Sequence, residues 1–139
     1  MKPIFVDASA LIAIGNKRDT FHSKSLEFRY SLKNSGRKFV TTSAVLLEFG
    51  NAFSHKKLKP TGIKMIEAVM HSKKWKCIEL TNELMNNGFD LYKRMNDKNW
   101  GLVDCTSIIV AHSMGISEIF TTDHHFEQAG FSILLKESY

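Results

Sequence analysis

Four acidic side chains stand inside or directly beside apolar segments of this 139-residue chain: Asp7, Glu48, Asp104 and Asp123. A buried carboxylate without a partner costs several kcal/mol or more, so each of the four needs a compensating group. No matching set of Lys or Arg side chains accompanies them in the sequence. We therefore expect their partner to be a divalent metal ion, because magnesium and manganese prefer carboxylate oxygen and water as ligands.

The chemistry open to such a cluster is the hydrolysis of a phosphodiester. Two divalent ions about 4 Å apart can activate a water molecule and stabilise the leaving oxygen. Three or four clustered acids are the minimum needed to hold them. Without a metal the carboxylates would repel one another, and at least one would have a raised pKa.

Taken one at a time, three of the acids have simpler explanations. Asp7 precedes an expected helix and could be an ordinary N-cap, a role that Ser9 could fill equally well. Asp123 begins a turn and could be a loop acid, with Thr121 orienting its carboxylate. Glu48 shares a helical stripe that could be a solvent face, and this explanation is as good as a functional one.

Asp104 is the acid that is hardest to explain without a function. It interrupts a long apolar stretch, and no Lys or Arg lies within one turn on either side. The helix face that it shares is made mainly of small residues, Ser107, Ala111 and Gly115. We therefore favour a functional role for Asp104 over a capping role.

The elements that position these acids alternate between short apolar strands and helices. We expect strands over residues 3–6, 39–42, 75–80, 118–122 and 131–135. We expect helices over residues 9–14, 20–32, 43–55 (with Ser43 as the N-cap), 60–70, 81–95 and 102–114. The alternation predicts an α/β fold, a three-layer sandwich in which helices cover both faces of a central parallel sheet. Binding crevices of such sheets lie outside the carboxyl ends of the strands, and both Asp7 and Asp123 lie at expected strand ends.

Composition and charge narrow the class of protein. The chain is 43% hydrophobic and 24% charged, as in ordinary globular proteins, and its length fits one domain, expected to span residues 1–139. Residues 1–80 contain 15 Lys and Arg against 6 Asp and Glu, whereas residues 81–139 contain 4 against 8. A basic half beside an acidic site suits a polyanionic substrate, with nucleic acid as the first candidate, although solvated helix faces explain the charge equally well.

Other kinds of site find no support in the sequence. Cys77 and Cys105 are not a CxxC pair, and we expect both to be reduced thiols in the core. His112 lies in an apolar helix and is expected to be a core residue, while His124 and His125 are adjacent and cannot share one helix face. Nucleotide-binding glycine motifs, HExxH and GxSxG are absent. Neither a signal peptide nor an apolar run of the ~20 residues that span a bilayer occurs, which predicts a cytoplasmic protein with no membrane partner.

Four segments of the chain together resemble the PIN domain family and, within it, the VapC-type toxins of toxin–antitoxin pairs. They are FVDASAL (5–11), AVLLEFGNA (44–52), DKNWGLVDC (97–105) and TTDHHFEQAGF (121–131). The first segment alone is common, whereas the third and fourth with their surroundings are quite specific. The resemblance covers essentially the whole chain in order.

The resemblance implies a site that binds one or two magnesium or manganese ions through the four acids named above. Glu48 would then point inward in spite of its solvent-like stripe. Ser9 and Thr121 would support this site from the side, and Asp97 could add an outer contact, although a loop acid explains it better. Ala8 and Val103 stand where hydroxyl residues are frequent in such proteins, which could loosen the hydrogen bonds around the metal.

The implied activity is metal-dependent endonucleolytic cleavage of RNA, whether tRNA, ribosomal RNA or messenger RNA. A homodimer and a separately encoded antitoxin that blocks the site are also implied.

Three other interpretations remain open. The chain could be an RNA-processing PIN nuclease without an antitoxin. It could be an inactive nucleic-acid-binding domain, although the intact acids argue against this. It could also be a receiver-like module in which an Asp at a strand end accepts a phosphoryl group. Against that reading, the chain has a lone Asp7 after the first strand and His124-His125 where receivers usually carry a Lys.

Overall fold

Five short strands form a parallel sheet at the centre of the computed structural model, which describes residues 2–136. In chain order they are β1 (Ile4–Val6), β2 (Phe39–Thr42), β3 (Trp75–Ile78), β4 (Glu118–Phe120) and β5 (Ser132–Ile133). Across the sheet the order is β3-β2-β1-β4-β5, so β1 lies in the middle. Phe5 of β1 is in register with Val40 on one side and Ile119 on the other.

Burial along the strands follows their place in the sheet. The central strands β1 and β2 are buried along their whole length, as expected of apolar strands covered on both faces. The edge strand β3 is only partly buried. Cys77 therefore lies exposed on β3, and the expectation that it belongs to the core is wrong, whereas Cys105 is buried as expected. Both thiols are free.

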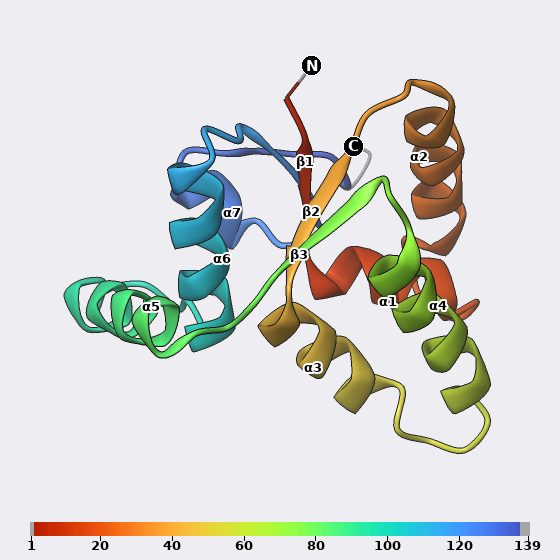
Figure 1. The fold of residues 1–139 in the computed structure, drawn as a ribbon, viewed down its shortest axis with the longest axis horizontal. Helices are drawn as coiled ribbons and strands as arrows, with labels where there is room; N and C mark the ends of the chain where they lie inside the picture. The colour runs from red at the N-terminus through yellow and green to blue at the C-terminus, as the bar shows by residue number, and fades with distance from the viewer. Residues whose placement is uncertain (1, 137–139) are drawn as a thin grey trace.

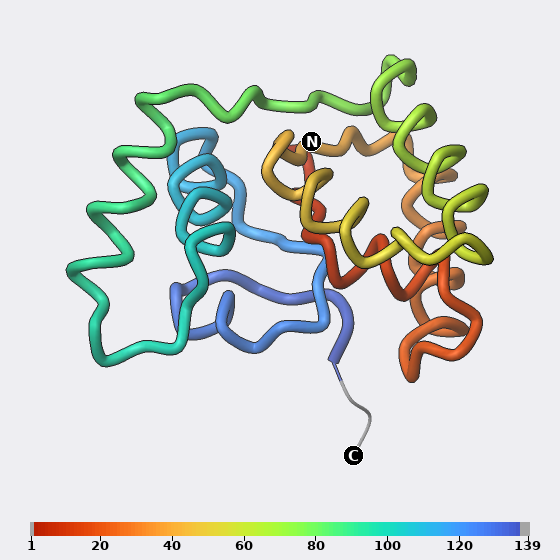
Figure 2. Tube along the Cα trace, turned by 90° about the horizontal axis from the view of Figure 1, so that it is seen from below, coloured from red at the N-terminus to blue at the C-terminus, as the bar shows by residue number. Residues whose placement is uncertain are grey.

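Helices enclose the sheet on both faces (Figure 1). They are α1 (Ala8–Gly15), α2 (His22–Asn34), α3 (Ser43–Ala52), α4 (Lys59–His71), α5 (Asn82–Arg94), α6 (Leu102–Ser113) and α7 (His125–Gln128). α1, α2 and α4 cover one face, α5, α6 and α7 lie on the other, and α3 lies across the carboxyl ends of the strands (Figures 1 and 2). This arrangement confirms the expected three-layer α/β sandwich. Every expected element is present, and α7 is an addition. Within residues 2–136, no helix combines the length and the apolar character needed to cross a bilayer.

The direction in which strands are added reverses beside β1. The chain first adds β2 and β3 on one side of β1, and it then passes through α5 and α6 to add β4 and β5 on the other side. After β1 the chain turns into α1 on one face, and after β4 it turns into α7 on the other. A reversal of this kind opens a crevice at the carboxyl ends of the two strands, where open α/β sheets bind ligands.

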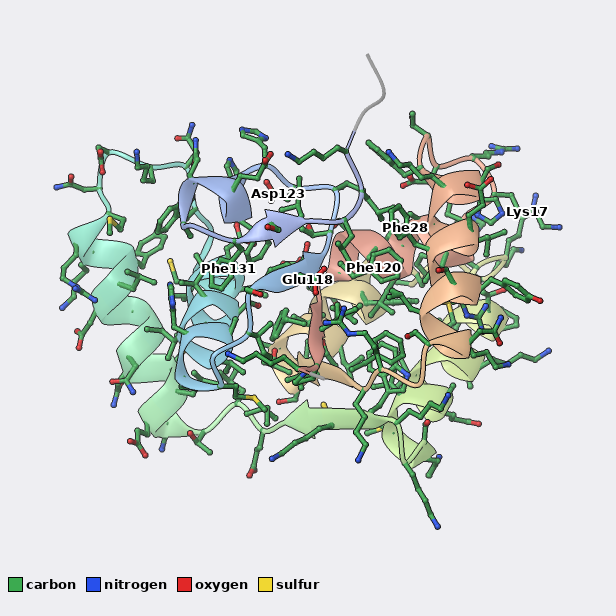
Figure 3. All side chains as sticks on the ribbon, turned by 90° about the horizontal axis from the view of Figure 1, so that it is seen from above. Lys17, Phe28, Glu118, Phe120, Asp123 and Phe131 are labelled. Atoms are coloured by element: carbon green, nitrogen blue, oxygen red, sulfur yellow. The ribbon has the colours of Figure 1, made fainter. Side chains whose placement is uncertain are left out.

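Aromatic side chains join the helices to the sheet region. Phe28 of α2 lies against Phe120 of β4, with ring centroids 6.3 Å apart (Figure 3). Near the other end of the sheet, His112 of α6 packs against Phe131 at 4.7 Å. His112 is nevertheless exposed to solvent, so the expectation that it is a core residue is wrong. It lies in the last turn of α6, where its ring covers Phe131 from outside.

The N-cap of α3 lies one residue earlier than the sequence predicted. The Thr42 hydroxyl oxygen accepts the Val45 N–H at 3.1 Å, which makes Thr42 the cap in place of Ser43. Ser43 instead accepts the Leu80 N–H at 2.8 Å, and so ties the segment that follows β3 to the start of α3.

Helices α5 and α6 pack closely at Gly88. A Cβ added there would lie 2.6 Å from Cγ2 of Thr106 and 3.3 Å from its backbone. Thr106 is buried, and its hydroxyl donates to the Val103 carbonyl at 2.7 Å, so the side chain cannot turn away without losing that bond. The lack of a side chain at Gly88 thus lets α5 support the helix that carries Asp104.

We predict that Gly88→Ala destabilises the protein, although the same change in an isolated helix is favourable by about 1 kcal/mol. The added methyl group would force α5 away from α6, and overpacking of this kind costs roughly 1–3 kcal/mol. Urea unfolding measures the difference in free energy. Asn87→Ala, at an exposed position of the same helix, is the matched control and should stay within about 0.5 kcal/mol of the wild type. A Gly88→Ala protein as stable as this control would contradict the packing argument.

Candidate metal centre

The four acids predicted from the sequence come from four different segments and meet at the carboxyl end of the sheet. Asp7 directly follows β1, Glu48 lies in α3, Asp104 lies in the first turn of α6, and Asp123 lies between β4 and α7. The charges of the three aspartates all raise the pKa of Glu48, so the four carboxylates lie within electrostatic reach of one another. Their meeting point lies at the carboxyl ends of β1 and β4, where the strand order reverses.

Asp7 forms the buried floor of this centre. It is 3% exposed, and its Oδ2 accepts hydrogen bonds from the hydroxyls of Thr121 at 2.8 Å and Ser9 at 2.9 Å. The Ser9 N–H also reaches Oδ2 at 3.4 Å, so Asp7 is the N-cap of α1 as well. Its Oδ1 is buried and has no hydrogen-bond partner among the described residues. Burial raises the pKa of Asp7 in spite of the hydrogen bonds to Oδ2.

The two hydroxyls that bind Asp7 are themselves held by the backbone. Ser9 Oγ accepts the Thr122 N–H, and Thr121 Oγ1 accepts the Asp123 N–H, both at 3.0 Å. The two hydroxyl oxygens also lie 2.9 Å apart. Each hydroxyl has only one proton, and the carboxylate Oδ2 is the stronger acceptor for both. Oδ2 is thus committed to the protein, and Oδ1 is left for another ligand.

Asp104 combines a structural contact with a place in the cluster. Its Oδ2 accepts the Gly101 N–H at 3.0 Å at the start of α6, so the capping role that the sequence analysis ranked lower is present. Burial, together with the charges of Asp7 and Asp123, raises the pKa of Asp104 to about 6, against the opposing effects of the Gly101 hydrogen bond and of His125.

Glu48 occupies the open side of the centre. It is exposed to solvent, which agrees with the solvent-face interpretation of its stripe. Partial burial of its carboxyl group, reinforced by the charges of the three aspartates, nevertheless raises its pKa to about 7. Glu48 also lines a hollow between α3, α5 and α6, together with Leu47, Met85 and Val103. The centre therefore has a dry side at Asp7 and a wet side at Glu48.

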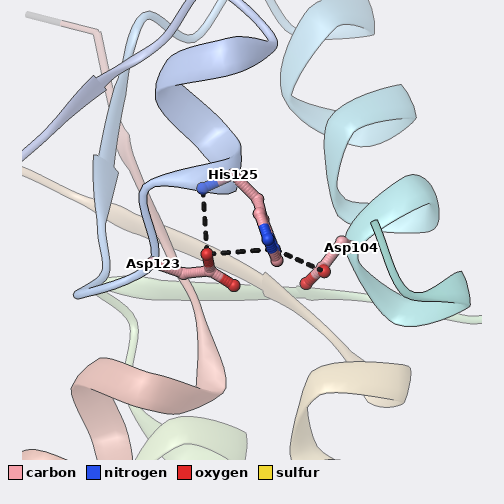
Figure 4. A group of neighbouring side chains, drawn as sticks. All are labelled: Asp104, Asp123 and His125. Atoms are coloured by element: carbon pink, nitrogen blue, oxygen red, sulfur yellow. Dashed lines mark hydrogen bonds and ion pairs between the residues drawn. The ribbon is translucent and has the colours of Figure 1, made fainter. Parts of the chain in front are cut away.

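A histidine that the sequence analysis did not assign lies between Asp104 and Asp123 (Figure 4). His125 Nδ1 is 3.1 Å from Asp123 Oδ1 and 3.9 Å from Asp104 Oδ2. The His125 backbone N–H donates to the same Asp123 oxygen at 2.9 Å. The available signal was a histidine two residues after a candidate acid, a spacing that lets a tight turn fold its ring back onto the carboxylate.

Three further residues that the family resemblance singled out have side chains that make no hydrogen bond or ion pair with the four acids. The Asp97 side chain is 69% exposed and pairs with Lys98 at 3.8 Å, as expected of a loop acid. Ala8 is fully buried in α1. Val103 lines the hollow beside Glu48. Because neither Ala8 nor Val103 has a side-chain donor, the hydroxyl support of the centre comes from Ser9 and Thr121.

The residues present fit a divalent cation. No ion pair between described residues joins any of the four acids to a Lys or Arg. Asp104, Asp123 and His125 each offer a ligand atom within 4.8 Å of the others. The buried Asp7 Oδ1 lacks a partner. A cation would supply that partner and would offset the repulsion between the carboxylates.

Comparison with known proteins agrees with the fold. A model of the PIN domain family matches residues 4–132. The chain belongs to the PIN domain family. This PIN domain is similar to the structure of VapC20 from Mycobacterium tuberculosis, a toxin that cleaves the sarcin-ricin loop, with 25% identity, a TM-score of 0.80, and coverage of 92% of this chain and 95% of that chain.

A second similar structure is VapBC2 from Rickettsia felis, bound to a DNA fragment from its promoter. The identity is 14%, the TM-score is 0.65, and the match covers 96% of this chain and 97% of that chain. At this identity the similarity concerns the fold. A search of curated proteins gives no significant match. The PIN domain is thus of the VapC type, which confirms the resemblance seen in the sequence. The receiver-like interpretation is wrong, because receivers have the strand order 2-1-3-4-5, whereas the order here is 3-2-1-4-5.

We predict that Thr121→Val destabilises the PIN domain by about 1–3 kcal/mol at neutral pH, because a buried carboxylate loses a donor and the Asp123 N–H loses its acceptor. Chemical denaturation gives the free energy of unfolding. Thr122→Val is the matched control, since the Thr122 hydroxyl makes no hydrogen bond in the described part of the chain. Equal stability of the two variants would show that the Asp7 contact contributes nothing.

We also predict that manganese raises the melting temperature more at pH 7.5 than at pH 5. The ordinary pKa values of Glu48 and Asp104 are 4.5 and 3.8, and the folded protein raises them to about 7 and about 6. Protonation of these groups therefore stabilises the metal-free fold fully below about pH 4, and this contribution is lost as the pH rises through 6 to 7. A cation that binds the ionised carboxylates restores stability mainly above that range. Thermal melts with and without manganese at both pH values measure the effect, and an equal increase at both would count against the cluster.

Proposed function

We propose that this PIN domain is a metal-dependent endoribonuclease, the toxin of a type II toxin–antitoxin pair. The observation that carries the proposal is the buried Asp7 Oδ1 without a partner, within electrostatic reach of the other acids in the crevice of a PIN fold. A cation-binding acid cluster supports phosphodiester hydrolysis. The similarity to VapC20 supports RNA as the substrate, with ribosomal RNA the first to test among ribosomal, transfer and messenger RNA.

Asp7, Asp104 and Asp123 would hold one magnesium or manganese ion, and Glu48 could hold a second directly or through water. Such an ion supplies an activated water and offsets negative charge on the leaving oxygen. Ser9 and Thr121 fix the orientation of the Asp7 carboxylate, so that Oδ1 stays available. Glu48 stands where solvent and substrate reach it, and its carboxylate suits the acceptance of a proton from the attacking water.

Basic side chains offer a place for the RNA backbone. Lys17, Arg18, His55 and Lys57 line a hollow between the end of α1 and the α3–α4 connection. α1 starts beside Asp7, and its 8 residues span about 12 Å, so the hollow lies about one short helix away from the acids. Figure 3 shows Lys17 well separated from Asp123. Phosphates on either side of the cleaved bond could bind in this hollow through Lys and Arg.

Exposed apolar side chains on α3 and α5 support a protein partner. Leu47 and Met85 line the hollow beside Glu48, and Phe89 and Tyr92 continue along α5. Exposed apolar groups gathered beside a site often mark a protein interface. An antitoxin seated there would block access to the acids, and the similarity to VapBC2 supports such a partner. Formation of a homodimer, and action on RNA in the cytoplasm, belong to the same proposal.

The test of this function is RNA cleavage by the wild type and by Asp104→Asn. We predict that the wild type cleaves RNA with manganese, that EDTA abolishes cleavage, and that Asp104→Asn lowers the rate on the order of 100-fold or more, because a charged ligand is lost. Cleavage sites mapped on total cellular RNA after brief expression would identify the substrate.

Asp97→Asn is the matched control, because it removes the same charge from an exposed loop, and it should cleave like the wild type. Unchanged cleavage by Asp104→Asn, or cleavage in EDTA, would overturn the assignment. An adjacent small upstream reading frame would distinguish a toxin from an RNA-processing nuclease without an antitoxin.

A further inference from the structure

His125 carries a ring nitrogen that the protein itself leaves unsatisfied. Nδ1 is buried and makes no hydrogen bond of acceptable geometry with any described group. The residue is nevertheless held beside Asp123, because its backbone N–H donates to Asp123 Oδ1 at 2.9 Å. A buried nitrogen that lies beside two carboxylates but makes no hydrogen bond needs a further partner.

The spacing of the three candidate atoms suits a common ligand. Nδ1 lies 3.1 Å from Asp123 Oδ1 and 3.9 Å from Asp104 Oδ2 (Figure 4). Two neighbouring ligand atoms on an ion with bonds of about 2.1 Å are about 3.0 Å apart in octahedral geometry, and opposite ones are about 4.2 Å apart. The two separations from Nδ1 lie within this range, and the three residues each offer a ligand atom within 4.8 Å of the others.

An alternative role for Nδ1 is that of a proton carrier. A protonated imidazole between two carboxylates would neutralise part of their charge, and it would then compete with a metal ion for the site. The two roles predict opposite effects when the ring is removed. Loss of a ligand weakens metal binding, whereas loss of a competing cation strengthens it.

We propose that His125 Nδ1 is a ligand of the ion at this centre, and that it turns an all-oxygen site into a mixed nitrogen and oxygen site that prefers manganese and later transition metals to magnesium. The reason is chemical, since imidazole binds first-row transition ions well, whereas magnesium takes oxygen ligands almost exclusively. The inference rests on the metal site of the proposed function and goes further, because it concerns which ion occupies that site.

The test measures metal binding directly, without RNA. Pulsed electron paramagnetic resonance of the manganese-loaded protein should show coupling to a directly bound ¹⁴N nucleus. The signal should change to that of ¹⁵N in protein made with ¹⁵N-labelled histidine, a readout that needs no variant. His125→Ala should lose the coupling, whereas His124→Ala, at the exposed neighbouring ring, should keep it.

The second part of the test compares the metal affinities of the wild type and of His125→Ala. Titration with manganese, and competition with magnesium, should show that His125→Ala weakens manganese binding about tenfold or more but changes magnesium binding less than about threefold. Tighter binding of both ions by His125→Ala would instead identify the ring as a competing cation and overturn the inference. Manganese binding without nitrogen coupling would also overturn it, while leaving the proposed nuclease in place. Absence of any manganese binding, together with cleavage in EDTA, would remove both.

Discussion

The hydrogen bonds that Ser9 and Thr121 donate to Asp7 are the contact on which the centre depends. Ser9 lies in the first turn of α1, on one face of the sheet, whereas Thr121 directly follows β4, from which the chain turns to the other face. A single carboxylate oxygen joins the two. Because Thr121 also accepts the Asp123 N–H, the position of Asp123 is set relative to Asp7 through one intervening hydroxyl. The two strand ends are thereby held at a fixed separation, and the crevice between them keeps its shape.

The carboxylates of the centre differ in their exposure to solvent. Asp7 is sealed from solvent, Asp104 is partly buried, and Glu48 is open. Charge at the buried end is therefore costly in the absence of a cation, and the pKa of each of these three groups is raised. The open end is where a large polyanion can approach. A cation bound at the dry end would offset the charge that is costly there, and the side at Glu48 would stay open to solvent.

The positions of most helices and strands can be predicted from local sequence patterns. Which elements lie next to one another in the fold cannot. The strands could be predicted because each is a short apolar run that directly precedes a helix, and Asp7 and Asp123 stood out because they follow such runs. Strand order is not a local property, so nothing in the sequence placed β3 at an edge with Cys77 exposed. Thr42 and Ser43 are adjacent hydroxyl residues, and only the geometry of the turn decides which of them caps α3. His125 was missed for a similar reason, since its part in the cluster comes from the one-turn helix α7, which is too short to leave a periodic pattern.

The bond between Asp7 and Thr121 spans 114 positions of the chain, and this separation ties the centre to the order of synthesis. The first acid leaves the ribosome early, but its carboxylate cannot be fixed until β4 has formed beside β1. The Leu135 N–H then closes on the Thr121 carbonyl at 3.1 Å, while the Leu135 side chain is fully buried. Contacts of such long range form late in folding, because a long loop must close before they are gained. An unfinished chain that lacks β4 therefore has no assembled acid centre.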